Sequence, residues 1–265
     1  MNNPETVASE IIRLVHTAGE RVRFYYNKDY KIEIKDDNSP LTKADTESND
    51  ILVAGLKKYG YPVLAEESID DKKRLDSEFI WTVDPLDGTK DFIQKTGEFS
   101  IIVGLIKNGE PIMGIVYQPV TGETYYGIKG QGSYKIKDGQ KVGLKTSTVS
   151  ETAEARAIVS RNHSGGPEED LAKKLQVKNY VKCGSVSLKM CKIAENKADI
   201  YLSLSPKSWE WDSAGGVVVL QEAGGVVTGM QGQDLKFNKK DPHNLDGIVG
   251  SANKELNKKI TKEIK

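Results

Sequence analysis

Two aspartates follow an apolar run in the segment "EFIWTVDPLDGTKDF", residues 78–92. Asp84 and Asp87 enclose a Pro-Leu pair, and a Gly-Thr pair comes directly after them. Carboxylates that lie close together disfavour each other's ionisation unless a positive group holds them. The proline stiffens the backbone between them, and Gly88 lets an anion approach the main chain closely. The spacing therefore favours a site for cations and an anion, although Pro, Asp and Gly also form simple turns.

Three further acidic positions share this character: Asp45, the pair Glu66-Glu67, and Asp212 in "WDSAGG". Each is ordinary by itself, because an aspartate at a helix start is usually a cap and a Glu-Glu pair after a strand is usually solvated. Strand ends and helix starts can nevertheless direct side chains into one crevice. Hard oxygen ligands, in a chain with 3 histidines, indicate Mg²⁺ rather than zinc. Two or three such ions beside an anion-binding turn predict phosphoester hydrolysis.

Hydrophobic periodicity predicts the elements that position these groups in the first half of the chain. Apolar residues at helical spacing indicate a helix near the N-terminus. The polar segment 36–50 leads into a second helix, which Gly60 is expected to end. The stretch "YPVLAEES" predicts a short strand, and Asn108-Gly109 is typical of a β-hairpin that continues as an antiparallel meander.

Strands and helices alternate in the second half, after a polar link near residues 140–155. The expected order is a strand at "AIVS", a helix from Pro167, a strand near Val181, a helix from Ser185, a strand at "DIYLSLS", a helix from Asp212 and a strand at "GGVVTG". Such alternation is typical of an α/β lobe. We therefore expect an N-terminal lobe of helices and antiparallel sheet, residues 1–145, and a smaller C-terminal lobe, residues 146–265, with the ligand site at their junction.

Composition and cysteine use exclude several classes of protein. The chain has 265 residues with 38 basic and 38 acidic side chains, and this neutral balance argues against binding to nucleic acid or anionic membranes. The N-terminus lacks the regions of a signal peptide, and no stretch approaches about 20 apolar residues, so we expect a cytoplasmic protein. Cys183 and Cys191 are expected to be buried thiols, about two turns apart on one helix and too distant for a disulfide.

The motifs resemble those of the inositol monophosphatase superfamily. "WTVDPLDGTKDF" matches its central motif, W-x-[IV]-D-P-[IL]-D-G-T-x-x-[FY], and "WDSAGGVVVLQEAGG" matches W-D-x-A-x-G…E-A-G-G. "SPLTKAD" and "LAEES" stand where that family has its T-x-x-D and [GS]-E-E-S elements, and the motifs follow the family's order. The resemblance implies an α/β fold, a layered αβαβα sandwich of the sugar-phosphatase type.

The resemblance also implies a set of metal ligands and catalytic groups. Glu66, Asp84 and the Leu86 carbonyl would hold one Mg²⁺. Asp84, Asp87 and Asp212 would hold a second, and a third, weaker ion would lie near Glu66.

Asp45 and Thr89 would activate the attacking water, with Thr89 passing its proton toward Asp45. The backbone N–H groups of Gly88 and Thr89 would hold the scissile phosphate. Glu67 is expected to support the metal ligands more than to touch an ion itself.

Within the superfamily the chain looks most like the 3′(2′),5′-bisphosphate nucleotidase branch, through "DPLDGTKDFI", "SRNH" and "GSVSLKMCKIAENKADIY". This branch implies removal of the 3′-phosphate of adenosine 3′,5′-bisphosphate or its sulfated analogue, a place in sulfur assimilation, and inhibition by lithium. His163, Ser185 and Lys189 stand at or near positions that contact the substrate there, and Asp212 would contact it too. Ser205 stands where inositol monophosphatases usually have a glutamate for the inositol hydroxyls, which disfavours a polyol substrate.

Other interpretations compete with this one. An inositol or sugar monophosphatase of the same superfamily would use the same metal ligands. A non-catalytic metal- or nucleotide-binding protein is disfavoured because every ligand position is filled. Nucleic acid polymers are disfavoured as partners, since no basic or aromatic platform is visible. Homodimers are common among relatives of this kind, and the sequence itself leaves the oligomeric state open.

Overall fold

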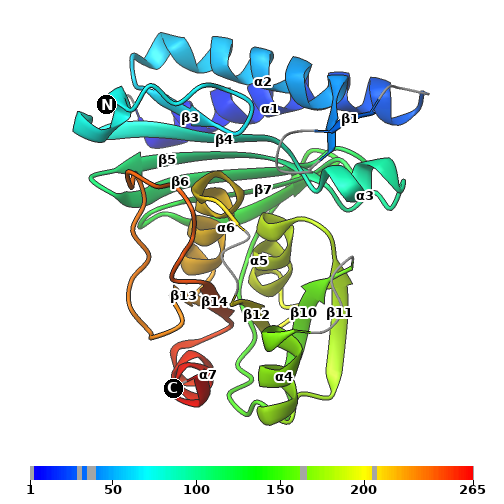
Figure 1. Cartoon of the computed structure of the whole chain (residues 1–265), viewed down its shortest axis with the longest axis vertical. Helices are drawn as coiled ribbons and strands as arrows, with labels where there is room; N and C mark the ends of the chain where they lie inside the picture. Colours follow the sequence, from blue (N-terminus) through cyan, green and yellow to red (C-terminus); the bar gives the residue numbers. More distant parts are fainter. Residues whose placement is uncertain (1–2, 29–31, 35–39, 162–165, 205–207, 265) are drawn as a thin grey trace.

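A computed structural model describes residues 3–28, 32–34, 40–161, 166–204 and 208–264 of the chain. The elements form five layers (Figure 1). Helices α1 and α2 cover one face of a larger sheet, α5 and α6 lie between this sheet and a smaller one, and α4 and α7 lie beyond the smaller sheet. This αβαβα order confirms the fold class predicted from the motifs.

The larger sheet has the strand order β3-β4-β5-β6-β7-β8-β9. Its strands are β3 (Val63–Ala65), β4 (Phe79–Asp87), β5 (Ser100–Lys107), β6 (Glu110–Gln118), β7 (Glu123–Ile128), β8 (Gly132–Lys137) and β9 (Gln140–Gly143). Strands β3 and β4 pair in parallel, and the other neighbours pair antiparallel. The predicted hairpin joins β5 to β6, where Asn108 and Gly109 have φ angles of 50° and 77°.

The segments around this sheet supply its helical cover and its connections. They are α1 (Pro4–Tyr26), β1 (Ile32–Ile34), β2 (Pro40–Thr42), α2 (Lys43–Leu56), the 3₁₀ turns η1 (Lys57–Tyr59) and η2 (Lys73–Asp76), and α3 (Thr89–Ile93). Helix α1 begins after Asn3, whose side chain accepts a hydrogen bond from the Glu5 N–H at 3.0 Å. Gly60 has a φ of 71° and ends the turn that extends α2, as its position predicted.

The smaller sheet has the order β11-β10-β12-β14-β13 and belongs wholly to the second half of the chain. Its elements and their neighbours are β10 (Arg156–Ser160), α4 (Pro167–Lys174), β11 (Asn179–Cys183), α5 (Val186–Ala194), β12 (Ile200–Ser203), α6 (Glu210–Glu222), β13 (Val226–Thr228), β14 (Ile248–Ser251) and α7 (Lys254–Ile264). The predicted alternation is therefore present. Sequence periodicity missed β14, which pairs antiparallel with both β12 and β13 and makes the sheet mixed.

One expectation about the second half needs correction. Cys183 ends strand β11 and Cys191 lies in α5, so the two thiols do not share a helix, although both are free and buried as expected. The lysine-rich C-terminal segment forms helix α7, whose Leu256 and Ile260 are buried while its outer face is solvated. No helix among the described residues has the length and apolar content needed to cross a membrane.

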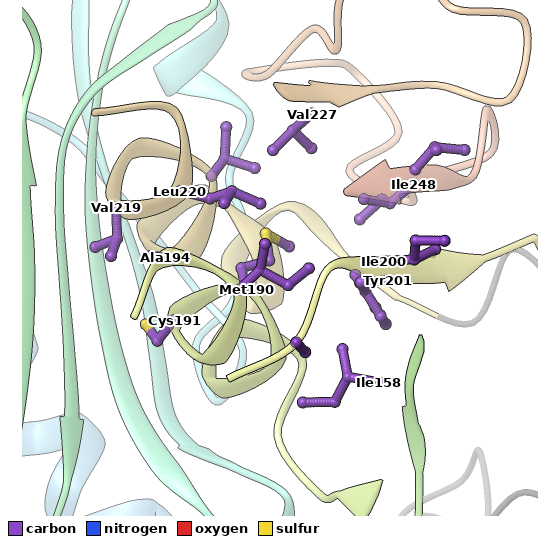
Figure 2. Close-up of a cluster of buried hydrophobic side chains, with 14 of the residues drawn as sticks. Ile158, Met190, Cys191, Ala194, Ile200, Tyr201, Val219, Leu220, Val227 and Ile248 are labelled. Atoms are coloured by element: carbon purple, nitrogen blue, oxygen red, sulfur yellow. The ribbon is translucent and has the colours of Figure 1, made fainter. Parts of the chain in front are cut away.

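Two clusters of buried side chains hold the layers together. One lies between α1, α2 and the larger sheet. The other joins α5 and α6 to the smaller sheet, and Figure 2 shows Met190 and Leu220 among side chains from strands such as Ile158 and Ile200. This second cluster also includes Tyr125 of the larger sheet, so it crosses the lobe boundary predicted near residue 145. That boundary stays a prediction.

Helix α6 approaches the larger sheet closely because glycines stand at the contact. A Cβ atom added at Gly114 on β6 would lie 2.2 Å from the Gly215 carbonyl oxygen of α6. A Cβ added at Gly104 on β5 would lie 2.9 Å from the Ala214 Cβ. Any side chain at these positions would push the helix away from the sheet. The glycines thus set the depth at which α6, with Asp212 near its start, is placed.

We expect Gly114→Ala to destabilise the protein by about 1–3 kcal/mol, because the new methyl group overpacks a contact made of backbone atoms. Gly143→Ala on β9 is the matched control, since its Cβ would find no atom closer than 4.0 Å. Urea unfolding of both variants would measure the difference. Equal stability of the two variants would show that the helix can retreat from the sheet without cost.

Candidate active site

The exit of β4 places Asp84 and Asp87 on the same side of the larger sheet. Asp84 pairs with Ile102 of β5 and Asp87 pairs with Ser100, so β4 has one extra residue in this interval. Residues three apart on a regular strand face opposite sides, and one extra residue brings them to the same side. Pro85, which has no N–H to donate, occupies the irregular stretch. The Asp-Pro-Leu-Asp order thus produces a pair of neighbouring carboxylates rather than a simple turn.

Glu66 joins this pair from the adjacent strand. It follows β3 directly, and its N–H donates to the Val83 carbonyl at 3.1 Å, which places it beside Asp84. Burial raises the pKa of the Asp84 carboxyl well above its ordinary value, and the carboxylates of Glu66 and Asp87 raise it further. Asp84 is 1% exposed, so water screens this repulsion little.

Asp212 completes the group from α6. It is the third residue of the helix, and one carboxylate oxygen accepts the Trp209 N–H at 2.8 Å, as in a capping box. Burial raises its pKa well above the ordinary value, and Asp87 and then Glu66 raise it further. The structure therefore places near one another the four carboxylates that the family resemblance assigned to Mg²⁺.

Backbone N–H groups fix one oxygen of each aspartate in this group. The Leu86 N–H donates to Asp84 Oδ1 at 2.9 Å, and the Val186 N–H donates to Asp87 Oδ2 at 2.7 Å. Within the described ranges, no group of three or more His, Cys, Asp or Glu side chains stands ready to hold a metal ion. The donor set is nevertheless all oxygen and consists of carboxyl groups, which is the chemistry that Mg²⁺ prefers.

Asp45 and Thr89 meet beside the exit of β4. The Thr89 hydroxyl is 3.2 Å from Asp45 Oδ1 and 3.3 Å from the Leu86 carbonyl oxygen. The other oxygen of Asp45 accepts from the Thr42 N–H at 2.8 Å and from the Thr42 hydroxyl at 2.6 Å. This capping box holds Asp45, which is 2% exposed, in one orientation at the start of α2. The hydroxyl therefore lies between a carboxylate and a strand-exit carbonyl.

Gly88 needs its glycine at this turn. Its φ is 96°, a region that side chains rarely adopt, and an added Cβ would lie 3.3 Å from the Glu98 carbonyl oxygen. It precedes α3 directly, so Thr89 is the first residue of that short helix. The predicted contact of these backbone N–H groups with phosphate stays a prediction.

Ser185 and Lys189 lie on the Asp87 side of the group. The Ser185 hydroxyl and the Val186 N–H both donate to Asp87 Oδ2 at the start of α5. Lys189 is 1% exposed, and its ammonium donates to the Gly184 carbonyl at 2.8 Å. Burial lowers the pKa of this lysine, while Asp87 is among the neighbouring groups that raise it. Both residues thus face the carboxylates, and their contact with a substrate stays a prediction.

Three other positions complete the comparison with the sequence. His163 and Ser205 lie outside the described residues. Glu67 is half-buried beside Glu66, and its supporting role stays a prediction.

Sequence reasoning missed two serines whose hydrogen bonds join separate elements at the site. Ser48 donates to the Pro85 carbonyl at 2.8 Å and so ties α2 to the exit of β4. Its spacing of three from Asp45, which puts both on one helix face, is the signal that could have found it. Ser187 donates to the Asp212 carbonyl at 2.6 Å and accepts from the Gly216 N–H at 3.1 Å, which ties α5 to α6. No local pattern identifies that link.

Comparisons with known proteins agree with this geometry. The sequence pattern of the inositol monophosphatase family matches residues 3–265. The 3′(2′),5′-bisphosphate nucleotidase CysQ of Aggregatibacter actinomycetemcomitans is 32% identical over 236 residues, which cover 88% of this chain and 87% of that protein. CysQ of Escherichia coli strain K12 is 32% identical over 237 residues, or 88% of this chain and 94% of that protein.

A solved structure gives the same result in three dimensions. The crystal structure of CysQ from Bacteroides thetaiotaomicron, a bacterial member of the inositol monophosphatase family, matches with a TM-score of 0.80 at 32% identity. The match covers 94% of this chain and 98% of that one. Because the family pattern extends over almost the whole sequence and these relatives share its fold, the chain belongs to the inositol monophosphatase family.

Proposed function

We propose that the chain is a Mg²⁺-dependent phosphatase that removes the 3′-phosphate of adenosine 3′,5′-bisphosphate. The observation that carries this proposal is the cluster of Glu66, Asp84, Asp87 and Asp212. Burial and the negative charges of the neighbouring carboxylates raise the pKa values of Asp84 and Asp212. Such a cluster needs cations before it can be fully ionised at neutral pH. The names of the bisphosphate nucleotidase relatives support the choice of substrate.

The residues that would hold Mg²⁺ are Glu66, Asp84, Asp87, Asp212 and the carbonyl of Leu86. When bound, Mg²⁺ would neutralise phosphate charge and favour ionisation of the attacking water. The all-oxygen donor set fits this ion, and the backbone hydrogen bonds to the aspartates limit how far each carboxylate must turn to reach it.

The protein's own groups would move the proton and hold the phosphate. Asp45 Oδ1 accepts the Thr89 hydroxyl, so a proton that Thr89 takes from water can pass to the carboxylate. Asp45 remains oriented during this transfer because Thr42 holds its second oxygen. The Gly88 turn would bring backbone N–H groups to the phosphate oxygens, where charge develops in the transition state.

The second phosphate and the base of the nucleotide would bind on the α5 side of the site. Ser185 and Lys189 are the described residues that we assign to this region, and Asp212 would also face the substrate. His163 is assigned to the same region by its motif alone. Because charge-assisted hydrogen bonds contribute about 1.5–3 kcal/mol, one such contact could separate a bisphosphate from a simple monophosphate.

Asp84→Asn should abolish turnover while leaving the metal-free protein folded. The amide removes a charge that two ion positions would share, but it keeps the acceptor for the Leu86 N–H. Because the folded-state pKa of Asp84 is raised, the wild type loses stability as pH rises above about 4, and the variant avoids that loss. Its unfolding midpoint at pH 7 without Mg²⁺ should therefore equal or exceed that of the wild type.

The control for this experiment is Asp138→Asn, a change of the same type at an exposed position. It should alter neither the rate nor the midpoint. A near-normal rate of the Asp84 variant at saturating Mg²⁺ would refute the ligand assignment.

Thr89→Ala should lower kcat about 10²–10⁴-fold, the usual range for lost acid–base positioning. Thr89→Ser keeps the hydroxyl and should recover most of the rate. Calorimetric titration with Mg²⁺ should give nearly the same affinity for both variants, because Thr89 contributes no ligand charge. Weaker Mg²⁺ binding with an unchanged kcat would reverse the role proposed for Thr89.

The choice of substrate is tested by initial rates on adenosine 3′,5′-bisphosphate, inositol 1-phosphate and fructose 1,6-bisphosphate. We expect kcat/KM to favour the bisphosphate nucleotide over inositol 1-phosphate by at least about tenfold, as one charge-assisted contact allows. Lys189→Met, which keeps the volume of the buried side chain, should erase much of that preference. Equal or faster hydrolysis of inositol 1-phosphate by the wild type would identify an inositol or sugar monophosphatase instead.

A further inference from the structure

Arg74 is a charged side chain that lies outside the group of carboxylates and has an exposure of 1%. It lies in η2, between the strand that leads to Glu66 and the strand that carries Asp84. Its guanidinium donates to Asp70, with the shortest contact at 2.8 Å, and to Asn238 Oδ1 at 2.8 Å. The Asn238 amide returns a hydrogen bond to the Arg74 carbonyl at 3.0 Å. A buried guanidinium is costly unless it is paired, so loss of these partners would destabilise the fold.

Asn238 is also held from its other side by Glu210, the first residue of α6. One Glu210 oxygen accepts the Asn238 N–H at 2.7 Å, and the other accepts the Lys239 N–H at 3.0 Å. Glu210 itself is fully buried. Asn238 has a φ of 59°, a conformation that asparagine tolerates better than most residues, so the backbone can present its N–H while the side chain faces Arg74.

These contacts form a continuous polar chain, Asp70–Arg74–Asn238–Glu210, which we call the buried clamp. Its two ends lie next to the carboxylate site along the sequence. Asp70 follows Glu66 by four residues, and Glu210 precedes Asp212 by two. The clamp therefore joins a segment from the first half of the chain to the helix start that supplies the last carboxylate.

Further hydrogen bonds join the segment before Asp212 to residues 238–244, which include Asn238. The Glu210 N–H donates to the Pro242 carbonyl at 2.9 Å, and the Asn244 amide donates to the Trp209 carbonyl at 2.7 Å. The Trp209 ring stacks on His243 at a centroid distance of 3.4 Å. Trp209 is the residue whose N–H orients the Asp212 carboxylate. Fixing this segment thus fixes the direction of Asp212.

We propose that the buried clamp is a positioning device for the metal site, which holds the Glu66 and Asp212 segments at the spacing that Mg²⁺ requires. The inference rests on the proposed function, since it concerns the ions of that site. Without the clamp, fewer contacts would resist the repulsion between the carboxylates that pushes the two segments apart. With the clamp, folding itself brings the carboxylates together, so less free energy is needed to arrange them when an ion binds.

The variant Asn238→Gly tests this role because it tolerates the positive φ, keeps the N–H for Glu210 and removes only the link to Arg74. We expect Mg²⁺ affinity, measured by calorimetry without substrate, to fall about tenfold, the lower end of the range for groups that orient metal ligands. Asn238→Asp retains an acceptor for Arg74 and should bind Mg²⁺ more tightly than the glycine variant. At saturating Mg²⁺ the kcat of both variants should approach that of the wild type.

Asn196→Gly is a close control for these changes. Asn196 also has a positive φ, 58°, and its side chain also accepts from an arginine, Arg156, at 2.8 Å, but it lies at the end of α5 away from the carboxylates. Its loss should leave Mg²⁺ affinity unchanged even where unfolding shows a similar loss of stability.

The outcomes separate this inference from the proposed function. The inference would be overturned if Asn238→Gly bound Mg²⁺ with wild-type affinity while its stability fell as in Asn196→Gly. The clamp would then stabilise the fold without positioning the metal ligands. Failure of the wild type itself to bind Mg²⁺ would overturn the proposed function, and the inference with it. Weaker binding in Asn238→Gly, with wild-type binding in Asn196→Gly, would support the positioning role.

Discussion

Repulsion among neighbouring carboxylates is the constraint on which the rest of this structure depends. Asp84 is almost fully buried, and the carboxylates of Glu66, Asp87 and Asp212 act on it through a medium that screens charge poorly. A fold that only maximised its stability would separate these groups or replace them. Backbone N–H groups hold one oxygen of each of the three aspartates in this arrangement, and such clustering of perturbed carboxylates is typical of functional sites.

The fold counters this repulsion mainly with helix starts. Asp45 and Asp212 are each the third residue of a helix and accept the N–H of the residue before it, while Asp87 accepts N–H groups at the start of α5. Helix N-termini carry partial positive charge and unpaired N–H groups, so they favour a carboxylate there. Lys189 acts in the same direction on the Asp87 side, where burial raises the pKa of the Asp87 carboxyl and Lys189 lowers it. These terms lower the cost of the cluster but do not remove it, since the pKa values of Asp84 and Asp212 stay raised.

Sequence patterns predicted those parts of the fold and site that depend on local spacing. Most helices and strands follow from periodicity, while the layered class and the set of four carboxylates were implied by the resemblance of the motifs to the family. The extra residue between Asp84 and Asp87 could be suspected from Pro85 but not placed, because a bulge is defined by its partner strand. The pairing of Arg74 with Asn238 joins positions 164 apart, and β14 finds its place only between two other strands. Such features depend on tertiary packing, which a local pattern does not encode.

The candidate site draws the residues assigned to it from both halves of the chain, and this division links folding to binding. The first half supplies Asp45, Glu66, Asp84 and Asp87, while the second supplies Ser185, Lys189 and Asp212. Close contact of α6 with the larger sheet, the hydrogen bond from Ser185 to Asp87 and the buried clamp all act across this division. A cation that binds the assembled carboxylates, and not the separated ones, stabilises the packing of the two halves against each other. By linkage, this packing favours cation binding by the same free energy. Without a cation, the packing of the two halves must therefore withstand the repulsion between the carboxylates by itself. Each polar contact between the halves adds to the free energy that opposes this repulsion.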